Sequence, residues 1–265
     1  MQTNAFGKIS RFSLVAAEKE GKTSLRDICF TAPYKMMSPF EKKDGSIEVM
    51  LMTASAGIME GDQQEFSFRI RHGAKLEFCS QSYDKIHQMK EEAASRNTEI
   101  QVEKGGEFIF HPQPVIPFGG SAFHNRTKVF LEDETSSFFM SEILSAGRVA
   151  RGERFAYRAY TNLTEIYRKE NLIYRDNTCY MPERFPMEEM GMYEGFTHLL
   201  NLFLTCPRED GAFVASVREL LEENQEAEGA VTRLRDGDFV VRALGYRAQV
   251  LEDLSHCILE KYRHI

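Results

Sequence analysis

Apolar and polar residues alternate with a period of two along the first two thirds of the chain. Clear examples are residues 66–70, 76–78 and 100–102. Side chains on a β-strand point alternately to its two faces, so this pattern predicts strands with one buried face. Residues 47–52 are mostly apolar on both faces, which favours a strand buried on both sides. With further strands expected at 138–144 and 155–167, the pattern predicts a body of roughly ten or more short strands.

The sequence also contains a weak internal repeat. Residues 70–78 align with residues 102–110 at an offset of 32, and a third, degenerate copy at 131–138 is offset by about 29. Each copy has the pattern strand, tight turn, strand. Repeats of this length are typical of stacked coils in a β-solenoid, but hairpins in a β-sandwich give the same local pattern. The repeat therefore leaves a distorted β-helix and a sandwich open.

The periodicity changes near residue 192. Residues 192–206 form a mostly apolar run that is compatible with a helix or a strand. A helix is predicted to follow from Gly211, with Asp210 as its N-cap and Phe213 and Val217 on its apolar face. A hairpin with its turn at 236–237 comes next. An amphipathic helix over 246–262 ends the sequence.

The expected fold is therefore mainly β. It consists of a distorted β-helix or solenoid-like body of many short strands and a C-terminal α-β-β-α segment. Nothing between them resembles a linker, so we expect one domain over residues 1–265. The β body would occupy about residues 8–190 and the C-terminal segment about residues 191–265.

Composition and charge exclude several classes of protein. Lys and Arg number 33 and Asp and Glu number 40, so the net charge of −7 argues against a nucleic-acid partner. No apolar run approaches the roughly 18 residues of a transmembrane helix, and the N-terminus lacks the features of a signal peptide. The five cysteines are scattered without a CxxC pair, which favours a reduced, cytoplasmic protein.

Motifs for catalysis are missing from the sequence. It contains no GxxxxGK[ST], GxGxxG, GxSxG or HExxH motif, and its seven histidines never occur as HxH or HxxxH. We therefore expect a protein that is not an enzyme and that holds no tightly bound cofactor.

Two carboxylates stand out against their local sequence. Asp62 ends a glycine-bracketed loop at 55–62, where it either caps a turn or points into an interior space. Glu142 lies in an otherwise apolar strand, so it needs a partner or polar surroundings. An ion pair with Arg148 or Arg151 and the lining of a polar cavity both remain open.

A proline-rich segment at residues 111–118 is the third unusual feature. Its three prolines within six residues force an extended backbone with few hydrogen-bond donors. Such a segment forms either a rigid surface ridge or an edge at which a partner docks.

In their order along the chain, these segments resemble the UreD/UreH family of urease accessory proteins. The matching motifs are the turn ending in Gly61-Asp62, the Gln- and Ser-rich strand leading to Lys85, residues 112–118, Ser141-Glu142 with residues 147–153, and the strand 239–245 with Arg242. The resemblance covers about residues 25–263. Many members have a longer glycine run where this chain has the bulkier residues 56–60, so the chain is more similar to the UreH branch.

The resemblance implies a β-helix-like body without catalytic activity. It implies a scaffold that forms a complex with the accessory protein UreF and the GTPase UreG and docks on the urease apoprotein. Nickel would bind only transiently, on its way through an internal tunnel to the urease active site. Scattered carboxylates suit such a path, and Asp62 and Glu142 are the expected lining, with Arg148 and Glu153 as supporting residues.

The two C-terminal helices are the expected docking surface for the UreF-type partner. The candidate contacts are Phe213, Val217, Val250, Leu254 and Ile258. The alternative is that both helices only cap the β body.

Two other functions remain open at this stage. A β-solenoid carbohydrate-active hydrolase with paired carboxylates is disfavoured because the chain has no Trp and no secretion signal. The other is an interaction module without a role in metal transfer.

Overall fold

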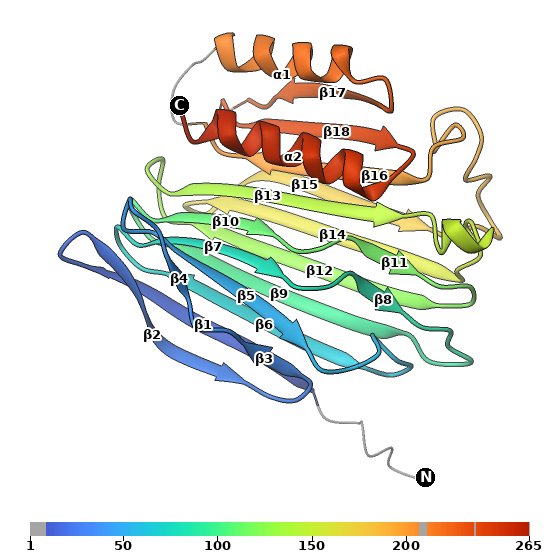
Figure 1. Ribbon diagram of the computed structural model, residues 1–265, viewed down its shortest axis with the longest axis horizontal. Coiled ribbons are helices and arrows are strands. Elements are labelled where there is room, and N and C mark those ends of the chain that lie inside the picture. Colours follow the sequence, from blue (N-terminus) through green and yellow to red (C-terminus); the bar gives the residue numbers. More distant parts are fainter. Residues whose placement is uncertain (1–8, 207–210, 236, 265) are drawn as a thin grey trace.

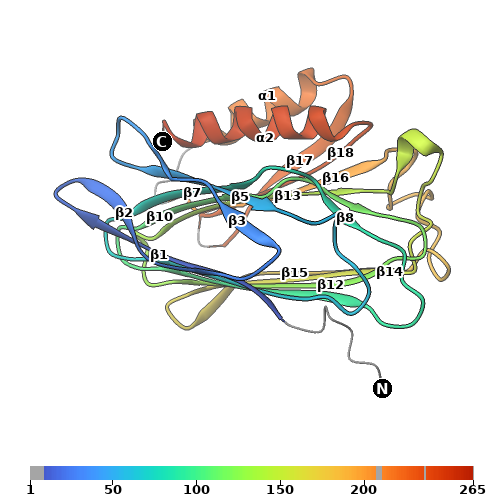
Figure 2. The same ribbon diagram turned by 60° about the horizontal axis from the view of Figure 1, so that its bottom comes forward.

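The computed structural model describes residues 9–206, 211–235 and 237–264. Within these residues the chain forms eighteen β-strands and two α-helices, so the predicted mainly β class is confirmed. The strands lie in two sheets that face one another, and both helices lie on the outer side of one sheet (Figures 1 and 2).

The smaller sheet has seven strands with a regular alternation of buried and exposed residues. Every second residue of its strand Gln63–Ile70 is buried, as the sequence pattern predicted. In spatial order the sheet contains β15 (Asn171–Tyr180), β14 (Ala159–Arg168), β12 (Ala122–Leu131), β9 (Ala94–Val102), β6 (Gln63–Ile70), β1 (Ser10–Lys19) and β2 (Lys22–Phe30).

The larger sheet has eleven strands. Its main path contains β17 (Ala227–Arg233), β18 (Phe239–Gly245), β16 (His198–Leu204), β13 (Ser137–Ser145), β10 (Glu107–His111), β7 (Lys75–Ser80), β5 (Ile47–Thr53) and β3 (Tyr34–Met36). Three short strands pair beside this path, namely β4 (Phe40–Glu41), β8 (Asp84–Ile86) and β11 (Val115–Pro117).

The strand expected at residues 155–167 begins later than predicted. Residues 155–158 belong to the connection between β13 and β14, which also contains a 3-10 turn at Val149–Arg151. Phe155 has a positive φ of 48°, a left-handed conformation that does not continue a strand. The alternating pattern alone did not reveal this turn.

The sequence repeat coincides with the register of the sheets. Ile70 pairs with Val102 and Leu76 pairs with Phe108, which reproduces the offset of 32. Val102 then pairs with Leu131. From β5 to β14 the chain alternates between the two sheets, and neighbouring strands of these repeats are parallel. Equivalent residues of successive repeats therefore stack on one another.

The C-terminal segment continues the larger sheet. The ambiguous run at 192–206 contains β16, which pairs antiparallel with β13, and the hairpin of β17 and β18 adds to β16. The helices α1 (Gly211–Glu223) and α2 (Ala248–Tyr262) cover the outer face (Figure 2). The proposed N-cap Asp210 and turn residue Asp236 lie outside the described residues. Among the described residues, no helix is long and apolar enough to cross a membrane.

The predicted docking face of the helices is part of the protein's own core. Phe213, Val217, Leu254 and Ile258 are at most 4% exposed and pack against the outer face of the larger sheet, with Val250 partly buried beside them. The expectation of a docking surface made of these side chains is therefore wrong. A wide apolar face on a helix indicates that the face is buried. Here it is buried against the larger sheet of the same chain.

Candidate functional site: a polar layer between the sheets

The inward-facing residues of the smaller sheet change from apolar to polar at one level. Register aligns one polar row across four strands, consisting of Gln64, Arg96, Asn125 and Asn162. The next inward row contains Thr98, Thr127 and Thr164. All seven face the opposite sheet, where apolar side chains are the rule. Buried polar groups need hydrogen-bond partners, so a double polar row between the two sheets requires an explanation.

The larger sheet supplies the opposite side of this level. Glu142 on β13 pairs in register with Asn201 on β16, which pairs with Arg242 on β18. Glu142 Oε2 accepts a hydrogen bond of 3.0 Å from Asn162 Nδ2, and Asn162 Oδ1 accepts one of 2.9 Å from Asn125 Nδ2. We call the two rows together with Glu142, Asn201 and Arg242 the polar layer. It crosses the interior from one sheet to the other.

Each arginine of the polar layer is neutralised by an aspartate. Arg96 Nη1 lies 2.7 Å from Asp84 Oδ2, and only 11% of the Arg96 side chain is exposed. Arg242 Nη2 lies 2.7 Å from Asp176 Oδ1, and about half of the Arg242 side chain is exposed. Arg96 thus belongs to β9 of the smaller sheet and Arg242 to β18 of the larger sheet, and Glu142 is the carboxylate of the layer that has no arginine partner among the described residues.

A narrow cavity lies within the polar layer. Its volume is about 30 Å³, and its lining includes Glu142, Asn125, Asn162 and Asn201. This volume has room for about one or two water molecules. Asn125 Oδ1 and Thr164 Oγ1 are buried without a hydrogen-bond partner among the described residues. These two oxygen atoms could therefore accept a hydrogen bond from water or bind a cation.

The carboxylate of Glu142 is surrounded by protein but faces this cavity, so its side chain is only half-buried. Burial raises the pKa of Glu142 above its usual value, while the hydrogen bond from Asn162 and the charge of Arg96 act in the opposite direction. No ion pair joins Glu142 to Arg148 or Arg151 among the described residues. The ion-pair hypothesis is therefore wrong, and the structure places Glu142 in a polar cavity lining.

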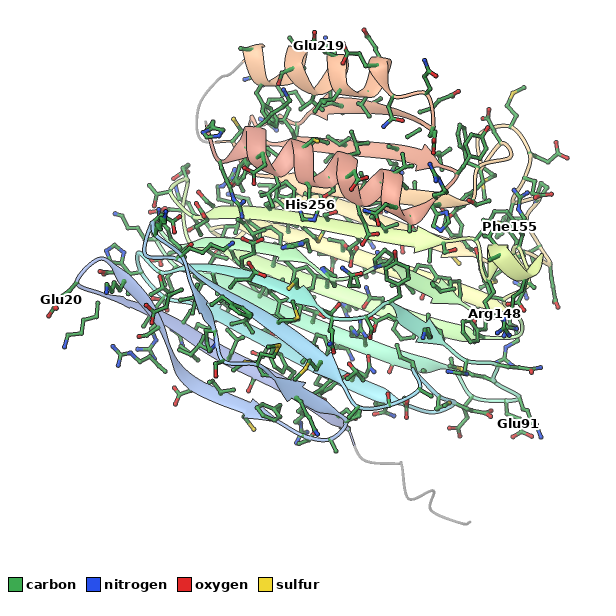
Figure 3. The ribbon with its side chains drawn as sticks, in the orientation of Figure 1. Glu20, Glu91, Arg148, Phe155, Glu219 and His256 are labelled. Atoms are coloured by element: carbon green, nitrogen blue, oxygen red, sulfur yellow. The ribbon has the colours of Figure 1, made fainter. Side chains whose placement is uncertain are left out.

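Arg148 and Glu153 lie outside the cavity lining. They pair with each other in the connection between β13 and β14, and Glu153 Oε1 accepts a 2.6 Å hydrogen bond from the Gly119 backbone. The ion pair with Arg148 lowers the pKa of Glu153. The Arg148 guanidinium also lies 4.3 Å from the centre of the Phe118 ring. Figure 3 shows Arg148 and Phe155 toward the same end of the molecule. The pair fastens this connection.

Asp62 forms the turn that its glycine-rich context suggested. Its Oδ2 accepts a 2.8 Å hydrogen bond from the Met59 backbone, and Gly61 beside it has a φ of 76°. Asp62 is not among the described residues that line the cavity. It does lie just before β6, two residues from Gln64 of the polar layer. The structure therefore does not bring Asp62 and Glu142 together in this cavity.

Most of the polar layer was not predicted from the sequence. Arg96, Asn125 and Asn162 were not singled out because a polar residue in an alternating strand is normally taken to face solvent. The repeat contained a usable signal for part of the row, since extending its alignment toward the N-terminal end of each strand brings Gln64, Arg96 and Asn125 together. Their shared inward orientation would then have followed from Phe68, Ile100 and Val129, the buried apolar residues further along the same strands.

Another carboxylate, Glu77, is buried on the outer face of the larger sheet. His111 Nε2 lies 2.9 Å from Glu77 Oε1, and Lys42 and Arg263 both pair with Glu77 Oε2. Burial by itself raises the pKa of Glu77, but hydrogen bonds from His111 and Lys42 and their charges lower it to about 2. These contacts fasten the end of α2 to β7 and to the β4–β5 turn. Glu77 is thus held by cations, unlike Glu142.

The polar layer offers oxygen ligands to a cation but does not enclose it as a closed metal site would. Across the described ranges, no group of three His, Cys, Asp or Glu side chains is arranged to hold a metal ion. The layer contributes one free carboxylate and several amide and hydroxyl oxygens. Such a set binds a cation weakly and exchanges it readily.

Comparisons with known proteins identify the family. The family model described as UreD urease accessory protein matches residues 8–265. The chain is 36% identical over 256 residues to urease accessory protein UreD of Acetivibrio thermocellus, which covers 96% of this chain and 97% of that protein. It is 38% identical over 240 residues to urease accessory protein UreH of Helicobacter pylori strain G27, covering 90% and 89%. The chain therefore belongs to the UreD/UreH family of urease accessory proteins, as its sequence motifs indicated.

Proposed function

We propose that this chain is a non-catalytic scaffold for nickel insertion into urease and that nickel passes through the polar layer. It would act in the cytoplasm, in a complex with a UreF-type protein and a UreG-type GTPase docked on the urease apoprotein. Membership in the UreD/UreH family supports the link to urease. The observation that carries the nickel path is the free Glu142 carboxylate inside a buried polar layer.

The chemistry of the layer suits transfer better than storage. A cation that must leave again needs ligands that replace part of its hydration shell without enclosing it. Amide, hydroxyl and carboxylate oxygens bind a late transition metal more weakly than a set of thiolates and imidazoles does. Because the cavity is only about 30 Å³, an ion would shed part of its water or move side chains aside to pass.

The charge distribution supports Glu142 as the main contact of the path. Asp84 and Asp176 are already paired with Arg96 and Arg242, so their charges are largely cancelled. The hydrogen-bond partners of Glu142 among the described side chains are the amides of Asn162 and Asn125, and no arginine pairs with it there. A cation in the cavity would favour the ionised form of Glu142 and be stabilised by it in turn. Asp62, Arg148 and Glu153 would then act indirectly, by fixing the loops around the layer.

The proposal is tested by reconstituting urease activation. Urease apoprotein, UreF-type and UreG-type partners, GTP and Ni²⁺ are combined with or without this chain, and urease activity and co-purification are measured. Activation and a stable complex should both depend on this chain. Full activation without it, or urea hydrolysis by the isolated chain, would contradict the proposal. A complex that assembles but is not required for nickel loading would instead favour a simple interaction module.

A further inference from the structure

Several exposed apolar side chains lie in the segment that contains β2, β3 and β4. Of the ten large apolar side chains exposed in the described residues, four lie between residues 28 and 40, namely Ile28, Phe30, Met37 and Phe40. Ile28 and Phe30 belong to β2, and they are 43% and 42% exposed. Both lie on the last strand of the smaller sheet, where no further strand covers them in the described structure.

The strand β2 has one open edge. It pairs only with β1 in the described structure and forms the last strand of the smaller sheet, along one margin of the molecule in Figure 1. Figure 3 shows Glu20, at the tip of the β1–β2 hairpin, at the same margin. The Thr23 amide donates to Gly45 O at 2.8 Å, so the edge is covered at its beginning. Residues 24–29 remain available, and an exposed strand edge is a template for another strand.

A bulge gives β2 a symmetric pattern of orientations. Leu25 pairs with Ala16 and Asp27 with Val15, so Arg26 is the extra residue of the bulge. Leu25 and Ile28 lie on the inner face, because they pair with the buried residues Ala16 and Leu14. Arg26 and Asp27 share the outer face opposite Val15, and Ser24 and Cys29 also lie on that face. The order of inner and outer residues is therefore the same from either end, with its centre between Arg26 and Asp27.

The chemistry of β2 is complementary about the same centre. In an antiparallel two-fold pair, Leu25 would lie opposite Ile28 of the second copy, and Arg26 opposite Asp27 of the second copy. Neither Arg26 nor Asp27 has an ion-pair partner among the described residues, and both are exposed. Cross-strand pairs of apolar and of oppositely charged residues stabilise a sheet. Two-fold symmetry would form each of these pairs twice.

We infer that two copies of this chain associate by antiparallel pairing of their β2 strands, centred between Arg26 and Asp27. The smaller sheets of the two copies then form one continuous sheet across the two-fold axis. Six residues from each strand make a small interface compared with the roughly 800 Å² per partner of stable complexes. The dimer is therefore weak and depends on protein concentration.

Charge exchange tests the pairing without touching the core. Sedimentation equilibrium of the full chain is compared with the single variants Arg26→Asp and Asp27→Arg and with the double variant that carries both changes. Each single change places like charges opposite each other twice, so dimerisation should weaken by roughly tenfold or more. The double variant restores opposite charges and should recover the wild-type affinity. A monomer at every concentration, or a dimer insensitive to the single changes, would overturn the proposal.

A cross-link tests the register independently. Ser24 lies opposite Cys29 of the second copy in the proposed pair, at the 4.5–5.5 Å Cα separation typical of antiparallel strands, roughly within reach of a disulfide. Mild oxidation of Ser24→Cys should produce a disulfide-linked dimer through Cys29, identified by peptide mass spectrometry. Lys22→Cys, two residues away, serves as the matched control and should not cross-link to Cys29. Equal cross-linking of both variants, or none in Ser24→Cys, would overturn the register and leave the β2 edge to a different partner.

Discussion

The space between the two sheets contains two regions with opposite chemistry. At one end aromatic side chains pack closely, with ring centres 4.8 Å apart for Phe68 and Phe78 and 5.4 Å for Phe78 and Phe110. At the other end, the polar layer surrounds a cavity lined by Glu142, whose hydrogen-bond partners are side-chain amides. The same strands contribute to both regions, since β12 supplies Asn125 to one and Val129 to the other.

The contrast between the two regions indicates that the aromatic end stabilises the fold and that the polar layer is the candidate functional region. Close packing of fully buried rings contributes large favourable free energy, whereas buried polar groups with incomplete hydrogen bonding cost free energy. A fold that keeps a polar row across four neighbouring strands, with Asn125 Oδ1 and Thr164 Oγ1 lacking partners among the described residues, is less stable there. The aromatic end offsets this cost, and the polar layer is available for an ion. The following predictions test this division, beginning with the largest expected effect.

Removing a ring from the aromatic end should destabilise the protein strongly. Phe68 is 1% exposed and contacts five other rings. Phe68→Ala should lower the free energy of unfolding by about 3–5 kcal/mol, measured by urea denaturation. Phe130→Ala, on the outer face of the smaller sheet and 36% exposed, is the control and should cost less than about 1 kcal/mol. Equal losses of unfolding free energy in the two variants would contradict a special contribution of the aromatic end to stability.

Glu77 tests whether a buried carboxylate with cationic partners contributes to stability. Its pKa in the folded protein is about 2, below the unfolded value, so its contribution is present at neutral pH and is lost as the pH falls toward 2. Glu77→Gln should lower the free energy of unfolding at pH 7 by about 2–3 kcal/mol. The gap between variant and wild type should narrow from about pH 5 downward. A gap that stays constant with pH would contradict this assignment.

Glu142 should behave in the opposite way. Its raised pKa means that the folded state disfavours the ionised form, so wild-type stability falls as the pH rises through this group's titration. Glu142→Gln keeps an acceptor for Asn162 and removes the charge. The variant should therefore match or exceed the wild-type free energy of unfolding, by up to about 1 kcal/mol, with the gain larger at pH 8 than at pH 5. Marked destabilisation at both pH values would assign Glu142 a structural role.

Much of the fold could be predicted because it depends on local periodicity. The alternation at residues 66–70 and the offset of 32 between residues 70 and 102 both reappear as strand faces and register. The two C-terminal helices also lie close to their expected positions. The surface that packs against an apolar helix face comes from residues distant in the sequence. The sequence of residues 246–262 could not reveal that the cover is the protein's own sheet.

A site residue could be predicted from the sequence only where its polarity differs from that of the residues beside it. Glu142 stands out because Ile143 and Leu144 follow it in an apolar strand, and it does line the cavity. Asn125 and Asn162 lie in strands where polar residues are common, and their contact spans 37 positions of the sequence. Arg148 was grouped with Glu142 by proximity in sequence, but the turn at Val149–Arg151 directs it to Glu153 instead. Pairing across a turn or between sheets is set by geometry that the sequence does not display.

The nickel content of urease shows whether Glu142 serves nickel transfer. Urease is reconstituted with wild-type chain, with Glu142→Gln, or with Glu165→Gln, a control carboxylate that is 9% exposed and pairs with Arg126 outside the polar layer. Pull-down of the partners verifies that each complex assembles. Glu142→Gln should lower the rate of nickel incorporation by roughly tenfold or more, corresponding to about 1.4 kcal/mol of lost cation stabilisation, while Glu165→Gln stays near wild type. A wild-type rate of nickel incorporation with Glu142→Gln in a fully assembled complex would contradict a role of Glu142 in nickel transfer.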